Sequence, residues 1–244
     1  MRALKPQGVF VKRLFYATLI CALAACSKPA TDAGTQTEST TAGETSTATT
    51  ETTASAPAAT ETKPTEEKPM SDYENKVAVL KTSAGEISIR FFPDVAPNHV
   101  KNFIDLAEKG FYNGTKFHRV IPGFMIQGGD PNTKAGDPYT WGTGGSGKNV
   151  NAEFSTVSHK RGIVSMARSN DPNSASSQFF IMHGNAPQLD RQYSVFGQVT
   201  KGMDVVDKIA TAPGRGETPV TPTVIEGITI RDANEDEKGA APKQ

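Results

Sequence analysis

Apolar residues gather in two regions of the chain, a short run near residue 20 and a long stretch from 77 to 231. Within the long stretch, short apolar or alternating runs bounded by Gly, Pro, Asn and Ser are typical of β-strands. They predict eight strands, at residues 77–80, 87–91, 116–120, 125–128, 163–166, 178–182, 195–200 and 224–231. The pattern therefore indicates a mainly β domain.

Two further segments have the spacing of helices. Residues 97–109 begin with a proline and end before Gly110, and residues 203–210 form the second segment. The apolar positions predicted to face inward are Val100, Phe103, Ile104 and Ala107 in the first, and Met203, Val206 and Ile209 or Ala210 in the second. Because strands and helices do not alternate as βαβ units, a doubly wound sheet is not expected. A closed eight-stranded antiparallel barrel capped by two helices fits the pattern.

The predicted strands around 125–128 and 178–182 are apolar on both faces. Phe179 and Ile181 would fill the interior of a barrel. The outward residues are then Phe124, Met125, Phe180 and Met182, with Gln127 and Gln178 among them. An outward apolar patch with a few amides is either a binding surface or a face buried under long loops, and the pattern leaves both open.

Charge and cysteine content exclude several kinds of site. The 26 basic and 26 acidic residues balance, which offers no support for a nucleic-acid partner. Both cysteines, Cys21 and Cys26, precede the predicted domain, so the domain has no disulfide framework and no thiolate nucleophile or metal ligand. The four histidines lack close ligand spacing, which argues against zinc.

The first 25 residues have the layout of a secretory signal, with basic residues followed by a mostly apolar run at 14–25. That run is too short to cross a hydrocarbon core, which needs roughly 20 residues. It ends in Leu23-Ala24-Ala25-Cys26, which resembles the lipobox of bacterial lipoproteins. The resemblance implies that the bond before Cys26 is cut and that Cys26 carries acyl chains anchoring the protein to a membrane. An ordinary cleaved signal is the alternative.

The stretch 27–72 contains no Leu, Ile, Val, Phe, Tyr or Trp, and 14 of the 35 residues from 31 to 65 are Thr. Such a composition cannot offset the entropy lost on ordering, so residues 26–72 are expected to form a disordered tether. A folded domain at 73–232 and a disordered tail at 233–244 complete the predicted organisation. By resemblance to bacterial lipoproteins, in which Asp after the cysteine is typical of inner-membrane retention, Ser27 favours the outer membrane of a bacterial cell envelope, facing the periplasm, and leaves exposure at the cell surface open.

Three ordered segments resemble the signatures of the cyclophilins, and the similarity runs from 77 to 231. The segments are Phe117-His118-Arg119-Val120-Ile121-Pro122-Gly123-Phe124-Met125-Ile126-Gln127-Gly128-Gly129-Asp130, then Ser165-Met166-Ala167-Arg168 with Ser176-Ser177-Gln178-Phe179-Phe180-Ile181, and finally Val195-Phe196-Gly197 with Lys201-Gly202-Met203-Asp204. The resemblance implies an antiparallel barrel with a helix at each end. It also implies isomerisation of X-Pro peptide bonds in envelope or secreted client proteins. A proline-binding adhesion or scaffold module without turnover is the alternative.

Carried over by position, the resemblance implies that Arg119 is the catalytic cation and that Gln127 steadies it. The substrate-binding residues that it implies are His118 at the rim, Phe124, Met125, Ala167, Gln178, Phe180, Leu189 and Tyr193. Rotation about an amide breaks no covalent bond, so no nucleophile, metal or cofactor is needed. The chain is expected to act as a monomer.

Two further positions affect which ligands are expected. Gln188 stands where the family commonly has Trp or Phe, so weak binding of cyclosporin is expected, whereas Tyr193 replaces a family His with a donor of similar reach. Residues 142–147 satisfy the dinucleotide fingerprint G-x-G-x-x-G, but no strand precedes them, no helix follows, and the acidic residue about 20 positions on is missing. A flexible loop beside the pocket is the better interpretation.

Overall fold

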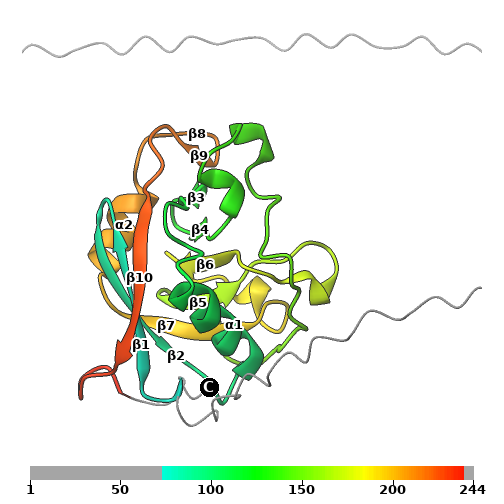
Figure 1. The fold of residues 1–244 in the computed structure, drawn as a ribbon, viewed down its shortest axis with the longest axis vertical. Coiled ribbons are helices and arrows are strands. Elements are labelled where there is room, and N and C mark those ends of the chain that lie inside the picture. Colours follow the sequence, from blue (N-terminus) through cyan, green and yellow to red (C-terminus); the bar gives the residue numbers. More distant parts are fainter. Residues whose placement is uncertain (1–72, 239–244) are drawn as a thin grey trace, which may run out of the picture. The chain divides into compact units, whose positions relative to one another are not determined.

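The computed structural model describes residues 73–238, whose strands and helices are arranged as in Figure 1. The predicted signal peptide at 1–25, the lipidated Cys26 and the tether at 26–72 lie outside the described residues, as does the end of the tail at 239–244. Within residues 73–238, no helix is long and apolar enough to cross a membrane.

Eight strands form one sheet in the order β10-β1-β2-β7-β5-β6-β4-β3, and every neighbouring pair is antiparallel. Their bounds are β1 Lys76–Thr82, β2 Gly85–Phe91, β3 Arg119–Ile121, β4 Met125–Gly128, β5 Ile163–Met166, β6 Phe179–Met182, β7 Val195–Lys201 and β10 Ile225–Asp232. Each strand lies at a predicted segment, so the prediction of eight antiparallel strands is confirmed. A separate hairpin of β8 (Gly214–Arg215) and β9 (Thr218–Pro219) was not predicted.

The prediction of a closed barrel is wrong, because the sheet is an open half-barrel. Its edge strands β3 and β10 form no ladder. The segment before β3 and the start of β10 are joined by an isolated bridge between Lys116 and Val224 and by neighbouring backbone hydrogen bonds, such as that from Ile225 N–H to Thr115 O (2.7 Å). Strand β3 has three residues, too few to pair along the eight residues of β10. Its Val120 N–H donates instead to the carbonyl of Glu217 in the β8–β9 hairpin (2.7 Å). The hairpin therefore takes the place beside β3 that barrel closure would need.

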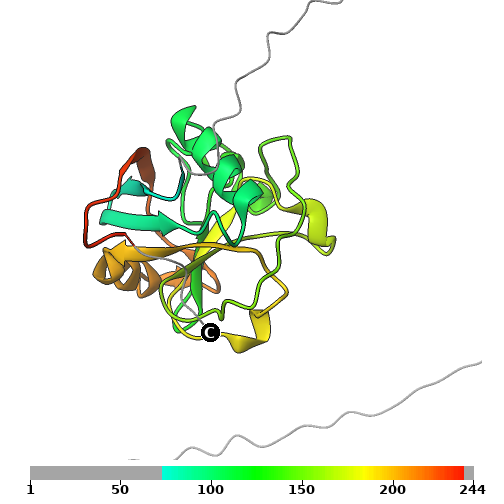
Figure 2. The ribbon, with the colours of Figure 1, turned by 90° about the horizontal axis from the view of Figure 1, so that it is seen from below.

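The inner face of the half-barrel and both helices share one apolar core. Helix α1 (Pro97–Glu108) and helix α2 (Met203–Ala210) pack on different sides of the strands, as Figure 2 shows. All four inward positions predicted for α1 are buried, whereas in α2 Val205 is buried and Met203 only partly so. At the centre, the Phe103 ring lies 5.0–5.8 Å from four other aromatic rings, which are those of Phe91, Tyr112, Phe179 and Phe196. Truncating such a residue costs about 3–5 kcal/mol.

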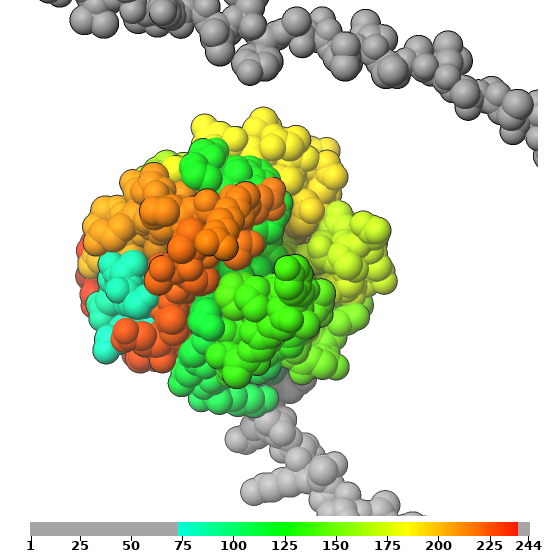
Figure 3. All heavy atoms as spheres, turned by 90° about the horizontal axis from the view of Figure 1, so that it is seen from above, coloured from blue at the N-terminus to red at the C-terminus, as the bar shows by residue number. Residues whose placement is uncertain are grey.

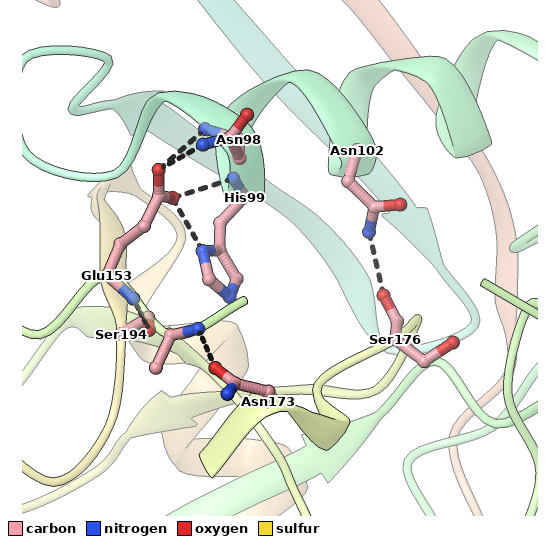
Figure 4. A network of polar contacts seen from close by, with 8 residues as sticks. Asn98, His99, Asn102, Glu153, Asn173, Ser176 and Ser194 are labelled. Atoms are coloured by element: carbon pink, nitrogen blue, oxygen red, sulfur yellow. Dashed lines mark hydrogen bonds and ion pairs between the residues drawn. The ribbon is translucent and has the colours of Figure 1, made fainter. Parts of the chain in front are cut away.

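A carboxylate from a distant loop caps the first turn of α1 (Figure 4). The residue before the helix, Ala96, has no side-chain acceptor, so the first N–H groups need partners from elsewhere. Glu153 accepts hydrogen bonds from the backbone N–H groups of Asn98 and His99, both at 3.0 Å. It also accepts from Asn98 Nδ2 (2.7 Å) and from His99 Nδ1 (2.6 Å). One side chain thus fixes the loop around residue 153 to α1.

The start of the predicted disordered tail is also corrected. Residues 233–238 lie against the domain, because the Glu237 carboxylate is buried and accepts two hydrogen bonds from the Arg231 guanidinium (2.7 and 2.8 Å). Asn234 N–H donates to the same carboxylate (3.0 Å), and Ala233 N–H donates to Asn75 O (2.7 Å). The charged residues of this segment predicted a solvated tail. A bidentate ion pair between Arg and a carboxylate can nevertheless hold a chain end in place.

Candidate active site

The outer face of strands β4 and β6 carries a second apolar cluster. Along β6, Phe179 and Ile181 belong to the inner core, whereas Phe180 and Met182 belong to the outer cluster together with Met125 of β4. This is the predicted alternation, and it follows from the period of two in a strand. Phe180 is 4% exposed and Met182 is fully buried, so loops cover most of this face. Burial, one of the two interpretations left open by the sequence, therefore applies to most of this face.

A cavity of about 110 Å³ remains between the outer cluster and its covering loops. Apolar side chains form one wall, and cations and amides form the other. The lining residues are Arg119, Phe124, Met125, Gln127, Ala167, Arg168, Phe180, Leu189 and Tyr193. All of them except Arg168 were assigned to the site from the sequence. The structure thus brings together residues from four separate stretches of the chain in one small cavity of mixed polar and apolar lining.

Aromatic contacts fix the floor of this cavity. The Tyr193 ring meets Phe180 edge-on, with centroids 5.5 Å apart at 85°, and the Arg168 guanidinium lies 4.8 Å from the Tyr193 centroid. On the other side, the His159 ring stacks against Phe180 at 6.1 Å. Such edge-on and stacked pairs restrict the rings to one orientation. The cavity therefore has a largely pre-formed shape.

Behind the floor lies a buried Ser-His-Asp arrangement. The Nε2 atom of His159 lies 3.0 Å from Ser165 Oγ, and its Nδ1 lies 3.0 Å from Asp190 Oδ1. Burial lowers the pKa of His159, although hydrogen bonding to Asp190 opposes this. Ser165 is fully buried, so no substrate carbonyl can reach its hydroxyl and nucleophilic catalysis is not supported. Asp190 directly follows η5 (Pro187–Leu189), so the arrangement anchors the end of η5, where Leu189 lines the cavity.

Along the polar wall, one guanidinium and two amides are joined by hydrogen bonds. Arg119 Nη1 donates to Gln127 Oε1 (3.4 Å), and Gln127 Nε2 donates to Gln178 Oε1 (2.9 Å). The register of the strands explains this, since Arg119 on β3 pairs with Gln127 on β4, which pairs with Phe180 on β6. Their side chains therefore share the outer face.

Gln178 faces a second cavity of about 180 Å³ that adjoins the first. Both cavities share Gln127, Ala167 and Arg168 as lining residues, so an extended peptide can run from one into the other. The far wall is the glycine-rich loop, whose Gly142 and Gly144 carbonyls accept from Gln178 Nε2 (2.9 and 2.8 Å). The remaining lining residues of the second cavity are Thr143, Ser169, Ser174 and Ser176.

The glycine-rich loop is fixed by Asp130, which lies two residues after the end of β4 at Gly128. Its carboxylate accepts from the backbone N–H of Gly142 and of Asn132. At Gly144, an added Cβ would lie 2.2 Å from Asp130 Oδ1, so only glycine allows the loop to approach this closely. The G-x-G-x-x-G pattern therefore reflects packing of a loop beside the second cavity.

The position predicted for His118 at the rim is wrong. Its side chain is 5% exposed, lines neither cavity, and has no hydrogen-bond partner for either ring nitrogen within the described structure. Burial lowers its pKa, while the charge of Asp130 acts in the opposite direction. Neighbouring residues of an extended segment point to opposite sides, so His118 and Arg119 cannot both face the cavity. His118 lies under the loop near Gly142 instead.

Two charged residues at the site were missed by sequence reasoning. Arg168 lines both cavities, and its place directly after Ala167 in a quoted motif was a usable signal. Glu217 accepts a hydrogen bond from Arg119 Nε at 2.5 Å, although the two residues are 98 positions apart. No local pattern around Glu217 indicates this contact. Among residues 73–238, no three His, Cys, Asp or Glu side chains gather as metal ligands.

Comparison with known proteins agrees with this geometry. Residues 77–230 match the family described as cyclophilin type peptidyl-prolyl cis-trans isomerase/CLD. A probable peptidyl-prolyl cis-trans isomerase of Brucella abortus is 50% identical over 144 residues, which cover 57% of this chain and 73% of that protein. A peptidyl-prolyl cis-trans isomerase of Acinetobacter baylyi is 40% identical over 170 residues, covering 66% of this chain and 88% of that one.

Solved structures show the same likeness. A cyclophilin-type isomerase of Cryptosporidium parvum, crystallised in the presence of the dipeptide Ala-Pro, has a TM-score of 0.59 and 32% identity, covering 64% of this chain and 99% of its own. A cyclophilin from Hirschia baltica has a TM-score of 0.54 and 29% identity, covering 69% and 81%. The family match spans nearly the whole sheet, both helices and the candidate site. The chain therefore belongs to the cyclophilin-type peptidyl-prolyl cis-trans isomerases.

Proposed function

We propose that this isomerase holds the proline ring of a client polypeptide in the 110 Å³ cavity and accelerates rotation of the preceding peptide bond with Arg119. The observation that carries the proposal is the position of Arg119, which lines the same cavity as the apolar side chains of Phe124, Met125 and Phe180. A cation beside an apolar hollow is suited to a ligand with an apolar ring and a polar bond at its edge.

The chemistry of the prolyl amide explains why a cation is needed. The planar amide has partial double-bond character, and rotation about it meets a barrier of about 18–20 kcal/mol. In the twisted state the nitrogen loses its resonance, becomes pyramidal and accepts a hydrogen bond. A guanidinium N–H that meets this nitrogen stabilises the twisted state more than the planar one, which lowers the barrier. No proton, electron or leaving group is transferred.

The surroundings of Arg119 strengthen this effect. The apolar wall excludes water from the proline ring, and electrostatic interactions are stronger where water is excluded. Arg is suited to the role because it remains charged and presents a rigid fork of donors. Gln178 and the Ala167 segment, which border the second cavity, hold the peptide backbone next to the proline. The Ala-Pro dipeptide used with the Cryptosporidium parvum relative supports proline-containing clients.

The proposed location is the bacterial cell envelope. The sequence Leu23-Ala24-Ala25-Cys26 supports a lipid anchor on Cys26, and Ser27 supports the outer membrane facing the periplasm, with surface exposure left open. The low-complexity stretch after Cys26 would act as a tether of roughly 35–40 Å, calculated for a flexible coil of that length. Clients would then be envelope or secreted proteins, and the isomerase would act as a monomer.

The test compares turnover with binding. We expect Arg119→Ala to lower kcat/KM about 10²–10³-fold, the loss typical of one preorganised transition-state donor. Binding of a proline peptide should weaken far less, because the apolar wall remains. The measurement is an NMR exchange assay beside calorimetric titration with the same peptide. Normal turnover by Arg119→Ala would refute the mechanism, and peptide binding by the wild type without exchange would support the binding module over the enzyme.

A further inference from the structure

A chain of hydrogen bonds crosses the polar wall from one end to the other. It begins at Glu217, which accepts from Arg119 Nε (2.5 Å), and continues from Arg119 Nη1 to Gln127 Oε1 (3.4 Å). It then passes from Gln127 Nε2 to Gln178 Oε1 (2.9 Å) and ends at the carbonyls of the glycine-rich loop, residues 142–144. Both ends of the chain are acceptors, and Arg119 is a pure donor within it.

The end at the loop fixes the orientation of both amides. The loop carbonyls can only accept, so the Nε2 group of Gln178 must face them and its Oε1 must face Gln127. Gln127 therefore directs its own Nε2 to Gln178 and its Oε1 to Arg119. The loop thus secures one contact of the guanidinium. The bond to Gln127 is long, however, so it cannot fix the guanidinium plane by itself.

The other end of the chain is held by the β8–β9 hairpin. The backbone carbonyl of Glu217 accepts from Val120 N–H (2.7 Å), and Val120 is the residue that follows Arg119 on β3. Glu217 therefore contacts β3 twice, by its backbone and by its carboxylate. In Figure 3, orange residues of the hairpin region lie against green residues of the segment that includes β3. The hairpin keeps the carboxylate at a fixed place relative to the root of the Arg119 side chain.

We propose that Glu217 is a positioning residue, which fixes the plane of the Arg119 guanidinium so that its remaining N–H groups face the prolyl amide. Of the five N–H hydrogens of a guanidinium, one is bound by Glu217 and one by Gln127, and three remain for the substrate. This inference rests on the proposed role of Arg119. It adds a residue outside the recognised motifs, from a hairpin that completes the site.

The exposure of the pair shows what kind of effect to expect. The side chains of Arg119 and Glu217 are 40% and 54% exposed, and exposed ion pairs contribute little to folding stability. Removal of Glu217 should therefore leave the melting temperature nearly unchanged. It should act on kcat, because an arginine free to rotate presents its donors to the twisted amide for only part of the time. It should hardly affect KM, because the apolar wall is untouched.

The experiment measures kcat and KM by NMR exchange at several concentrations of an Ala-Pro-containing peptide with the full chain. We expect Glu217→Ala to lower kcat about tenfold with KM within about twofold, a part of the loss caused by removing the donor itself. Glu217→Gln should recover most of kcat, because its amide oxygen can still accept from Arg119 Nε. The control is Glu226→Gln, which removes an exposed carboxylate paired with Lys81 (3.3 Å) on β1, and it should leave kcat unchanged.

A second readout does not depend on the alanine variant folding. The ¹H–¹⁵N signal of Arg119 Nε, assigned by its loss in Arg119→Lys, should be protected from exchange in the wild type and in Glu217→Gln. Unchanged kcat in Glu217→Ala, equal losses of kcat in the alanine and glutamine variants, or an unprotected Nε signal in the wild type would each overturn the inference. If any of these three results is found while Arg119→Ala is inactive in the same assay, the positioning role of Glu217 is refuted but the proposed function stands. If Arg119→Ala is fully active, the proposed mechanism fails as well.

Discussion

Removing the Glu153 carboxylate should destabilise the domain strongly, because four hydrogen bonds converge on it. Two come from the backbone N–H groups of Asn98 and His99 and two from their side chains, at 2.6–3.0 Å. The side chain of Glu153 is only 13% exposed and that of His99 is fully buried. Glu153→Ala would leave the first turn of α1 without a cap, and it would leave a buried imidazole N–H without its acceptor.

The size of the loss follows from these contacts. An N-cap contributes about 1 kcal/mol, and an orphaned buried donor such as His99 Nδ1 costs about 1–3 kcal/mol. Since the four contacts share one carboxylate and are not additive, we expect about 3 kcal/mol for Glu153→Ala. Burial by itself raises the pKa of Glu153, but the hydrogen bonds from His99 and Asn98 outweigh it and hold the pKa below its ordinary value. The contacts therefore exceed the cost of desolvation.

Urea unfolding followed by the fluorescence of Trp141, the single tryptophan of the chain, measures this loss. Glu153→Gln should lose less than Glu153→Ala, because one oxygen still accepts while the new NH₂ group faces donors. Glu226→Ala, which removes an exposed carboxylate, is the matched control and should change stability by less than about 0.5 kcal/mol. If Glu153→Ala lowers the free energy of unfolding by less than about 1 kcal/mol, with the slope of that free energy against urea concentration unchanged, the cap is not stabilising.

Three other predictions concern pH, the inhibitor and the anchor. The pKa of Glu237 is lowered to about 2, mainly by its hydrogen bonds with Arg231. Its contribution to folding stability is therefore complete above its ordinary pKa of about 4.5 and is lost as pH falls through about 2. Glu237→Gln should flatten acid unfolding curves in that range and lower stability at pH 7 by about 1–3 kcal/mol. Gln188 is exposed beside the cavity, so calorimetry should show weak cyclosporin binding that tightens in Gln188→Trp; tight binding by the wild type would contradict the assignment of this position. Cys26→Ser should release the protein from membranes in fractionation without detergent, and a mutant that stays with membranes would exclude the lipid anchor.

The parts of the fold that the sequence predicts are those that depend on local periodicity. Alternation along 178–182 separates Phe179 and Ile181 from Phe180 and Met182, and the structure places the two pairs in different apolar clusters. The same holds for the inward stripe of α1. Side-chain direction in a strand or helix is determined by the backbone period, so a correct assignment of the element also gives its buried face. The site residues on β4 and β6 were accessible to prediction for this reason.

The parts that the sequence does not predict depend on single contacts between distant polar residues. Glu153, Glu217 and Glu237 are each one charged residue in a polar segment, and nothing nearby distinguishes them from a solvated carboxylate. Each has its partner on another part of the fold, namely α1, Arg119 and Arg231. Barrel closure failed for a related reason. Val120 N–H of β3 bonds to the short hairpin at 214–219 and not to β10, and that hairpin has no apolar pattern to reveal it.

The separation of the two apolar clusters explains how this domain can hold a substrate site without weakening its fold. The inner cluster joins all eight strands of the sheet with both helices, and it contains the packed rings around Phe103. The outer cluster is smaller and is completed by loops, so a cavity there removes no contact from the inner core. Strands β4 and β6 carry both clusters on opposite faces, so the stable inner core also fixes the backbone that presents Met125 and Phe180. Pre-organisation of the site then comes from the core, and the polar chain from Glu217 to the glycine-rich loop needs only to orient one guanidinium.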